Sequence, residues 1–322
     1  MTRRWGRRVD AFWFAPTDPA TLALVRVAFG ALVTLWALSL APDLGAFFST
    51  AGVIGDAMPR GGNGTWSLLW IDHSDTTVAA VYLALLAAAV GIMVGWRSRV
   101  CAAVVLVALT SLARANPYVF NSGDTLIRVL AFYLMLAPSG MEFSLDRRRA
   151  RQQRRDVAST HPAWPLRLIQ IQISIMYLGA VWSKFQGPSW RDGTAASYAA
   201  RLPDLVRFQL GDVFERSALA AQVATYATLA VESSLAILIW HRRTRPFALA
   251  AGVLLHLSID LSIRVGFFTL AVFVAYLSFA DPQQVRAAVA TAKRLRARVR
   301  SPASRAALEP EPQPEPAGRV AH

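Results

Sequence analysis

Apolar residues in this chain fall in long blocks that are separated by shorter polar or charged segments. A helix needs about 17 to 25 mostly apolar residues to cross a bilayer, and several blocks approach that length. We therefore predict an all-α fold, a polytopic transmembrane helix bundle with about eight spans. The predicted spans are Thr21–Ala41, Thr76–Gly95, Val100–Arg114, Asp124–Pro138, Trp164–Lys184, Ser217–Trp240, Pro246–Ile263 and Gly266–Ala280. The fourth and the last are short, and a buried helix or a re-entrant hairpin would show the same pattern, so seven spans is the alternative.

The charged residues lie mostly between these blocks, and their positions favour eight spans. The formal net charge is +14, and the basic residues gather at the N-terminus, at 97–99, 147–155 and 242–245, and near the C-terminus. With a cytoplasmic N-terminus and eight spans, all of these groups fall on the cytoplasmic side, as the positive-inside rule requires. We therefore predict a multi-pass protein of the plasma membrane with both termini in the cytoplasm. The same distribution argues against a nucleic-acid partner, because the positive charge forms no single patch outside the membrane.

The blocks also divide the chain into three parts. Residues 1–282 are predicted to form the transmembrane domain in the lipid bilayer, and residues 283–301 a basic amphipathic helix beside the membrane. Residues 302–322 include the stretch EPEPQPEPAG, which alternates proline with acidic residues, and are predicted to be disordered. In the outer loop that follows Lys184, the segment from Trp190 to Glu215 mixes apolar with charged residues, so we expect an interfacial helix that caps a site below it.

Lys184 is the most informative single residue. The chain has 34 basic residues, of which only Lys184 and Lys293 are lysines. A buried lysine can release a neutral amine, whereas an arginine stays charged, so Lys184 is a candidate base; the alternative is a lysine that anchors the helix at the membrane interface. Polar residues recur at helical spacing on the same span, on one face that should point towards protein or water. The positions of this face are Gln170, Ser174, Tyr177, Val181 and Lys184.

Further polar residues interrupt the other spans. Asp124 and Arg128 are four positions apart and are predicted to form an ion pair, just after Asn121. Glu232 stands alone in an apolar run, where it must be protonated or paired, for example with an arginine. His256 and Asp260 are again four apart, so that the carboxylate could orient the imidazole. The proposed topology brings most of these residues to the outer half of the bundle, which predicts one cavity there. The cavity residues are Asn121, Asp124, Arg128, Tyr177, Lys184, His256 and Asp260. The lone Cys101 and the separated histidines predict no metal site.

Three stretches resemble a known family. They are NPYVFNSGDTLIRVLAFYLMLAPSG, IQIQISIMYLGAVWSKFQGPSWRDGTAASY and LHLSIDLSIRVGFFTLAVFVAYLSF. Together they resemble the horizontally transferred transmembrane (HTTM) domain family, which is related to the vitamin K-dependent gamma-carboxylases. Tyr177, Lys184, Trp190 and Gly193 fall where the carboxylases have a tyrosine, their essential lysine, a tryptophan and a glycine.

The resemblance implies a role for each matched residue. Lys184 would be the base that deprotonates a reduced lipid quinone, vitamin K hydroquinone or menaquinol, and His256 would line the quinone cavity. Tyr177 and Phe185 would contact the quinone ring. The carboxylases have a functional histidine where this chain has Ser122, Gly123 and Asp124, and they continue into a lumenal domain that presents glutamates. We therefore expect chemistry on the quinol rather than carboxylation of a protein.

The sequence is compatible with two functions. The first is a quinol-dependent oxygenase or carboxylase-like enzyme with Lys184 as its base. The second is a non-catalytic membrane protein that binds a lipid or a secreted peptide in an accessory or maturation role. Transport of a small solute is less favoured because the sequence shows no inverted repeat. The first function needs Lys184 to lose its proton near neutral pH, whereas a close carboxylate contact would favour the second.

Overall fold

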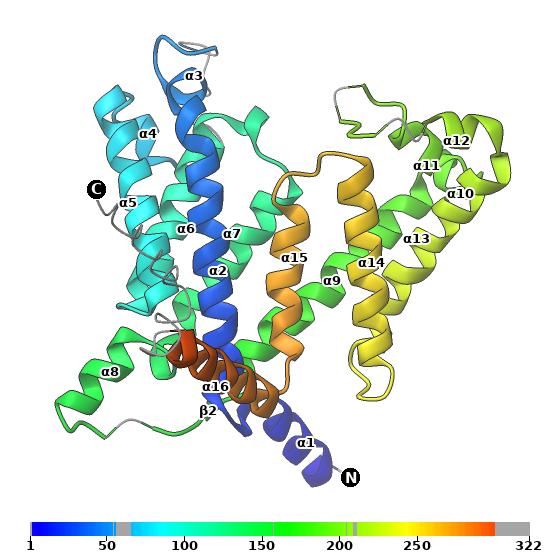
Figure 1. The fold of residues 1–322 in the computed structure, drawn as a ribbon. Coiled ribbons are helices and arrows are strands. Elements are labelled where there is room, and N and C mark those ends of the chain that lie inside the picture. The colour runs from blue at the N-terminus through cyan, green and yellow to red at the C-terminus, as the bar shows by residue number, and fades with distance from the viewer. Residues whose placement is uncertain are drawn as a thin grey trace, which may run out of the picture. The chain divides into compact units, whose positions relative to one another are not determined.

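The computed structural model describes residues 2–53, 55, 66–156, 158–203, 205–208 and 211–299, and it divides into two compact units after Ala280. The first unit contains all the predicted spans (Figure 1). Its long helices are α1 (Thr2–Phe14), α2 (Pro19–Leu40), α5 (Asp75–Val94), α6 (Ser98–Ala115), α7 (Ser122–Leu136), α9 (Trp164–Gln186), α13 (Ala218–Leu238), α14 (Arg245–Ser262) and α15 (Phe268–Tyr276). Shorter helices are η1 (Ala41–Asp43), α3 (Leu44–Phe48), α4 (Leu68–Ile71), η3 (Pro117–Val119), η4 (Ser139–Met141), α8 (Leu145–Gln152), α10 (Pro188–Arg191), α11 (Ala195–Ala199), α12 (Gly211–Arg216) and η5 (Leu277–Phe279).

Each of the eight apolar blocks folds as a helix, but they differ in how well they suit a membrane. Five helical stretches in the described part of the chain are long and apolar enough to cross one, namely Pro19–Phe48, Asp75–Val94, Ser98–Ala115, Trp164–Gln186 and Ala218–Leu238. A sixth, Phe268–Phe279, is apolar but shorter. Helix α7 has only 15 residues. The helical class of the fold is thus confirmed, whereas the count of eight spans and the cytoplasmic termini stay predictions.

Local sequence signals explain where these helices begin and end. The side chain of Asp18 accepts the backbone N–H of Ala20, and Pro19 occupies the first turn of α2, where its missing N–H costs nothing. Helix α5 ends at Gly95, whose φ of 74° lies in the left-handed region that glycine adopts without strain. A two-stranded antiparallel ladder, β1 (Pro16–Thr17) with β2 (His161–Pro162), holds the segment before α2 beside the segment before α9.

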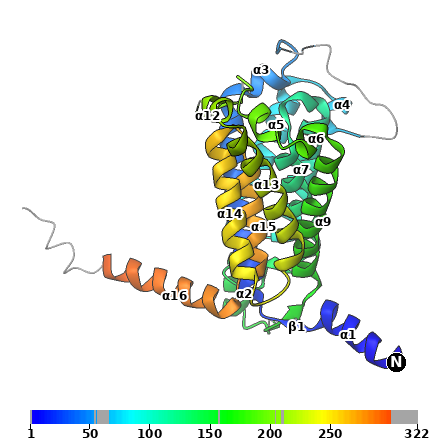
Figure 2. The same cartoon turned by 90° about the vertical axis from the view of Figure 1, so that its right-hand side faces the viewer.

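The helices of the first unit pack as two groups joined by α15. Helix α2 packs on α5, α5 on α6 and α6 on α7, while α13 packs on both α9 and α14. Helix α15 contacts α2, α7, α9 and α14, and in Figure 1 it stands between the two groups. In Figure 2 the short helices α3 and α12 lie at one end of the bundle, and α1 with β1 lies at the other. The loops predicted to be outer and the N-terminal segment thus occupy opposite ends.

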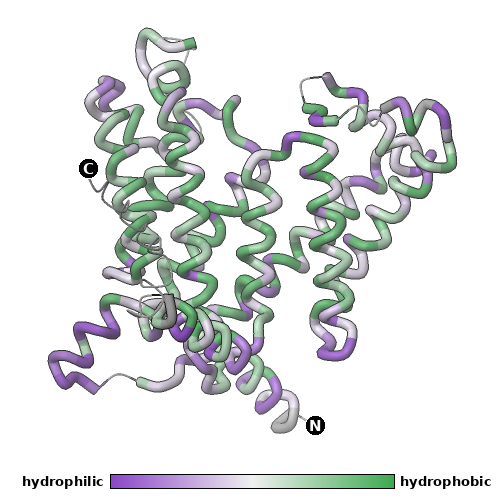
Figure 3. Tube along the Cα trace, in the orientation of Figure 1, coloured by the Kyte–Doolittle hydropathy of each residue, from purple (hydrophilic) through white to green (hydrophobic). Residues whose placement is uncertain are grey.

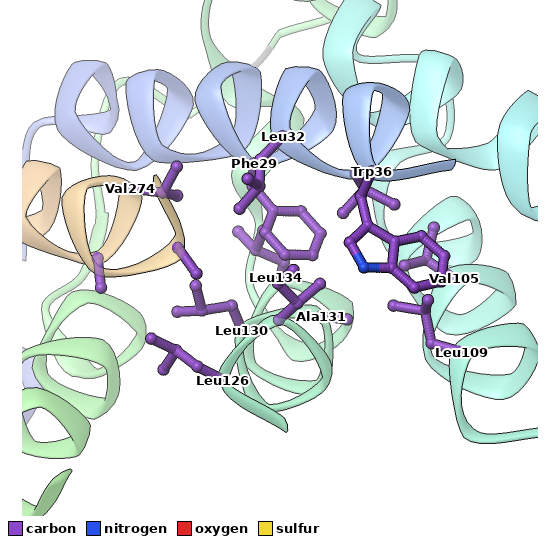
Figure 4. Packing of buried hydrophobic residues seen from close by; sticks show 14 of the residues in the cluster. Phe29, Leu32, Trp36, Val105, Leu109, Leu126, Leu130, Ala131, Leu134 and Val274 are labelled. Atoms are coloured by element: carbon purple, nitrogen blue, oxygen red, sulfur yellow. The ribbon is translucent and has the colours of Figure 1, made fainter. Parts of the chain in front are cut away.

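The core of the first group is built from large apolar side chains on four helices. Phe29 of α2 lies near Leu130 of α7, and Trp36 of α2 lies near Leu109 of α6, with Val274 of α15 also in the cluster (Figure 4). Hydropathy along the chain follows the same division, because the helices carry the apolar residues and α8 is strongly hydrophilic (Figure 3). Large apolar side chains also stay exposed on the outer faces of the helices, as for Ile175 at 57% and Trp182 at 71%, which is what a lipid-facing surface requires.

The outer segment after Lys184 and the C-terminal segment compare differently with what the sequence predicts. The capping segment from Trp190 to Glu215 is not one interfacial helix: it forms α10, α11 and the start of α12 with irregular chain between them. A bridge between Val206 and Ile263 ties this segment to the end of α14. The second unit has helix α16 (Pro282–Val299), where an amphipathic helix was predicted. The predicted Pro/Glu tail, residues 302–322, lies outside the described residues.

Candidate intramembrane site

Helices α9 and α13 are joined by an ion pair inside the bundle. The Nζ atom of Lys184 donates to Oε1 and Oε2 of Glu232 at 2.5 and 2.6 Å. The Glu232 side chain is 7% exposed and that of Lys184 is 21% exposed, so the acid is the more deeply buried partner. A carboxylate that receives two hydrogen bonds from one ammonium group is held in a fixed orientation. Glu232, which the sequence left without a partner, is therefore the counter-ion of Lys184.

An aromatic ring covers the amine on the side of the outer segment. Helix α9 ends at Gly187, and α10 follows directly, which brings Trp190 back over the last turn of α9. The Nζ atom of Lys184 lies 5.1 Å from the ring centroid, a cation–π distance. Lys184 and Trp190, which the resemblance singled out together, are therefore in contact.

A second polar cluster lies deeper in the bundle, where three rings from α9, α14 and α15 meet. The hydroxyl of Tyr177 lies 2.6 Å from Nε2 of His256 and 2.5 Å from the hydroxyl of Tyr276. All three side chains are buried, with His256 at 2% exposed. The hydroxyl of Tyr276 fits only because Gly252, one turn before His256, has no side chain: a Cβ there would lie 2.4 Å from it. The cluster is thus a continuous chain of groups that can each hold or pass a proton.

His256 has one nitrogen without a partner. Its Nδ1 atom is buried and makes no hydrogen bond to any described residue. Around it stand the rings of Phe268 and Phe273, with centroids 5.5 and 6.4 Å from that of the imidazole. A buried polar atom that is left unpaired costs free energy. His256 therefore offers one hydrogen-bonding position in an aromatic environment that nothing in the described chain uses.

The two clusters face the same side of α9. Tyr177 and Lys184 are seven residues apart, which is two helical turns and about 10 Å along the axis. They are also close enough for the charge of Lys184 to act on His256 and that of Glu232 to act on Tyr276. On the polar face predicted for α9, Gln170 and Tyr177 are buried, so this part of the face points into the protein. Phe185, expected to contact a quinone ring, is 52% exposed.

Asn121 and Asp124 belong to a separate cluster at the start of α7. Asp124 accepts the indole N–H of Trp36 at 2.7 Å and the backbone N–H of Asn121 at 2.7 Å, which forms a capping box for the helix. A cavity of about 230 Å³ adjoins them, lined also by Asp43 and Phe267. The lining of this cavity does not include Lys184, so Asn121 and Asp124 contact each other and α2 at a place separate from the Lys184 pair.

Both predicted pairs at four-residue spacing have other partners. The oxygens of Asp124 are occupied as described, and Arg128 donates instead to the hydroxyl of Thr125 at 3.1 Å. Asp260 lies 3.6 Å from Arg207 of the outer segment, whereas His256 is turned inward towards Tyr177. Spacing along one helix places two residues on the same face, but a neighbouring helix can offer a better partner to each of them.

Two members of the site, Glu232 and Tyr276, were not among the cavity residues predicted from the sequence. Glu232 was visible as an isolated acid in an apolar run, and the isolated Lys184 was its natural complement, so the pairing signal was present. Tyr276 gave no such signal, because a tyrosine in an apolar helix is ordinary packing. Only the crossing of α15 over α9 brings its hydroxyl to Tyr177.

The fold indicates a helical membrane protein with several candidate spans, two of which, α9 and α13, are joined by an ion pair. The family model of the HTTM domain matches residues 65–283, which is more than half of the chain. The chain therefore belongs to the HTTM family, and the match begins after α2. Comparisons with curated proteins and with solved structures gave no match.

Proposed function

We propose that this protein oxidises a lipid-soluble quinol with molecular oxygen, with the Lys184–Glu232 pair as its proton-accepting centre. The observation that carries the proposal is the bidentate ion pair between α9 and α13. Burial of two charges costs several kcal/mol per ion, and their attraction often does no more than offset that cost. An ionisable pair inside a membrane is therefore better explained by a function than by stability.

The pair suits a phenolic substrate on chemical grounds. The carboxylate of Glu232 can accept the hydroxyl proton, and the ammonium group of Lys184 can hold the resulting oxyanion beside it. In this arrangement the two residues act as one unit, which modifies the expectation of a free lysine base. Trp190, already stacked on Lys184, gives the flat ring of a quinol an aromatic surface at the same place.

The cluster of Tyr177, His256 and Tyr276 would bind the other end of the same substrate. His256 has an unused ring nitrogen, and the surrounding aromatic rings form the apolar environment that a quinone ring needs. The chain from His256 through Tyr177 to Tyr276 can hold the second hydroxyl proton of the quinol. A quinol and one molecule of oxygen would give the quinone epoxide and one molecule of water, which balances without another reductant.

A second candidate is an accessory membrane protein that binds a lipid or a peptide without catalysis. The same ion pair favours it, because the amine of Lys184 is already occupied by a carboxylate at 2.5 Å. In that case the pair would join α9 to α13, and the Tyr177 cluster would only specify how α14 and α15 pack.

One experiment separates these two functions. The purified protein in lipid nanodiscs is given reduced vitamin K or menaquinol with oxygen, and the quinone epoxide is measured by mass spectrometry. We expect epoxide from the wild type, none from Lys184→Ala, and wild-type amounts from Lys293→Ala, which removes the other lysine. Folded wild-type protein that forms no epoxide from either quinol would refute the oxygenase and favour the accessory role.

A further inference from the structure

A cavity of about 420 Å³ opens at the turn between α5 and α6, at the end of the bundle opposite α3 and α4. It lies in the first unit and is separate from the Lys184 site. The turn itself, the segment around η4 and the first turns of α8 form its walls. The lining residues are Arg97, Ser98, Arg99, Val100, Pro138, Gly140, Met141, Asp146, Arg147 and Ala150.

The first turn of α6 points hydrogen-bond donors at this cavity. Arg97 precedes the helix in a left-handed conformation, with φ at 44°, and no described side chain caps the backbone N–H groups that follow. Such uncapped groups give a helix N-terminus a partial positive charge that attracts anions. Ser98, also in the lining, is only 4% exposed, and its hydroxyl makes no hydrogen bond within the described chain. A buried hydroxyl without a partner is an unfilled position for a polar ligand.

The charges of the lining add to this preference. Arg97, Arg99 and Arg147 outnumber the single acid, Asp146. Arg97 lies over the ring of Trp96, and Arg99 uses its Nε atom on the carbonyl of Met135, which leaves the terminal nitrogens of Arg99 for another ligand. Arginine binds phosphate through two parallel hydrogen bonds. This group of arginines therefore favours a phosphate over a neutral molecule.

An apolar groove continues from the same point along the surface of the bundle. Its volume is about 450 Å³, and Val100 lines both the groove and the arginine cavity. Small residues of α5 and α6 form most of its floor, from Val100 to Ala108 on α6, which is about 12 Å of helix. The lining residues are Leu68, Ala80, Val81, Ala84, Val100, Ala103, Val104, Val107 and Ala108. The absence of polar side chains from this lining excludes a hydrated ligand there.

We propose that these two features are one binding site for an anionic phospholipid. The phosphate lies among Arg97, Arg99 and the N-terminus of α6, and one acyl chain follows the groove between α5 and α6. Positive side chains at the end of a span, next to an apolar groove open to the bilayer, match the two chemically different parts of such a lipid. Neither part of the site contributes to the Lys184 pair, so the proposal is independent of quinol chemistry.

Native mass spectrometry of the full chain, delipidated in detergent, tests this site. The probes are phosphatidylglycerol, phosphatidylcholine with the same acyl chains, and inorganic phosphate. We expect phosphatidylglycerol to bind tightest and the variant Arg97→Gln/Arg99→Gln to lose about 10- to 30-fold of that affinity, because each arginine near an anionic lipid contributes about fivefold. The control variant Arg242→Gln/Arg243→Gln removes the same charge from another exposed turn and should retain the affinity.

A third variant tests the acyl groove by itself. Ala84→Phe fills the groove without changing any charge, and it should weaken phosphatidylglycerol while leaving the overall fold, followed by size-exclusion chromatography, unchanged. Equal loss in the Arg97/Arg99 and Arg242/Arg243 variants would overturn the site in favour of general charge attraction. Competition by millimolar inorganic phosphate, together with no effect of Ala84→Phe, would overturn the lipid in favour of a free anion.

Discussion

Lys184 and Glu232 lie 48 residues apart in the sequence and are joined by two hydrogen bonds, of 2.5 and 2.6 Å, between α9 and α13. This contact changes the chemical role that Lys184 can have. From the sequence alone, Lys184 was a candidate base; in the structure, a carboxylate fixes the position of its amine. A reaction at this site must therefore begin from the pair, and the pair is also the simplest reason for the two helices to meet in this register.

Removal of only the acid should be costly. Glu232→Gln leaves the charge of Lys184 buried without its counter-ion, which typically destabilises a protein by about 3 to 5 kcal/mol when the pair is fully buried. Because Lys184 is 21% exposed, we expect a loss towards the lower end of that range. The measurement is unfolding of the purified protein by a denaturing detergent, followed by circular dichroism.

The double variant Lys184→Met/Glu232→Leu is the matched control for that loss. It removes both charges and keeps side chains of similar length, so we expect its stability to return to within about 1 kcal/mol of the wild type. A double variant that is less stable than Glu232→Gln alone would show that the contact is not an ion pair. Epoxide formation, if the wild type has it, should be absent from both variants.

The hydroxyl of Tyr177 should be necessary for the cluster around His256. Tyr177→Phe removes the one group that bonds both His256 and Tyr276 and leaves these two polar atoms buried without a partner, at about 1 to 3 kcal/mol each. We expect a clear loss of stability in the same unfolding assay. Tyr198→Phe is the control, because that ring is 62% exposed. Equal stability of the two variants would mean that the hydroxyl network is not formed.

Much of the architecture follows from the sequence, because length and apolarity alone identify a membrane helix. All eight blocks are helices, and the polar face of α9 was placed at Gln170 and Tyr177 from the 3.6-residue period. The HTTM resemblance, carried by the stretches around Lys184 and His256, is confirmed by the family model. These features depend on local sequence, which is why they could be predicted.

Contacts between helices could not be predicted in the same way. Asp124 was expected to pair with Arg128 on its own helix, but its carboxylate accepts a hydrogen bond from Trp36 of α2. Asp260 was expected beside His256, yet the outer segment brings Arg207 to it. In each case the partner comes from a distant part of the chain, and no periodicity within one helix contains that information.

Acid should weaken the contact between the segments before α2 and α9, through His161. Burial lowers the pKa of this side chain, whose Nδ1 atom lies 2.7 Å from the carbonyl of Pro162 and whose Nε2 atom is buried without a partner in the described chain. Above its ordinary pKa of about 6.5, folded and unfolded chains both hold the neutral ring and stability does not change. Below that pH the unfolded chain takes up the proton first, so stability falls as the pH decreases.

The measurement for His161 is unfolding at pH 7.5, 6.5 and 5.5. We expect the wild type to lose stability across this range, and His161→Gln, which cannot titrate, to lose less. A His73→Gln variant is the control, because that histidine lies in the loop after α4 and is not part of the ladder of β1 and β2. The same slope in the His161 variant and the wild type would rule out His161 as the group that titrates.

Arg26 should be among the most important single residues for stability. It is fully buried in α2, and its guanidinium group donates to backbone carbonyls alone: Ser139 at 3.1 Å, Met93 at 3.0 Å, Phe143 at 2.7 Å, and also Ile92 and Glu142. These carbonyls belong to the end of α5 and to the segment around η4. One side chain thus joins three parts of the chain at one end of the bundle.

Arg26→Met keeps most of the side-chain volume and removes all the donors. We expect it to cost about 3 kcal/mol or more, because several buried carbonyls lose a charged partner at once. The stability of Arg26→Lys should lie between that of Arg26→Met and that of the wild type. An ammonium group has three donors and cannot reach carbonyls on both sides as the planar guanidinium does. Arg243→Met removes an exposed arginine and should change stability by no more than about 0.5 kcal/mol. If Arg26→Met matched this control in the unfolding assay, the carbonyls would have to be satisfied without the guanidinium group.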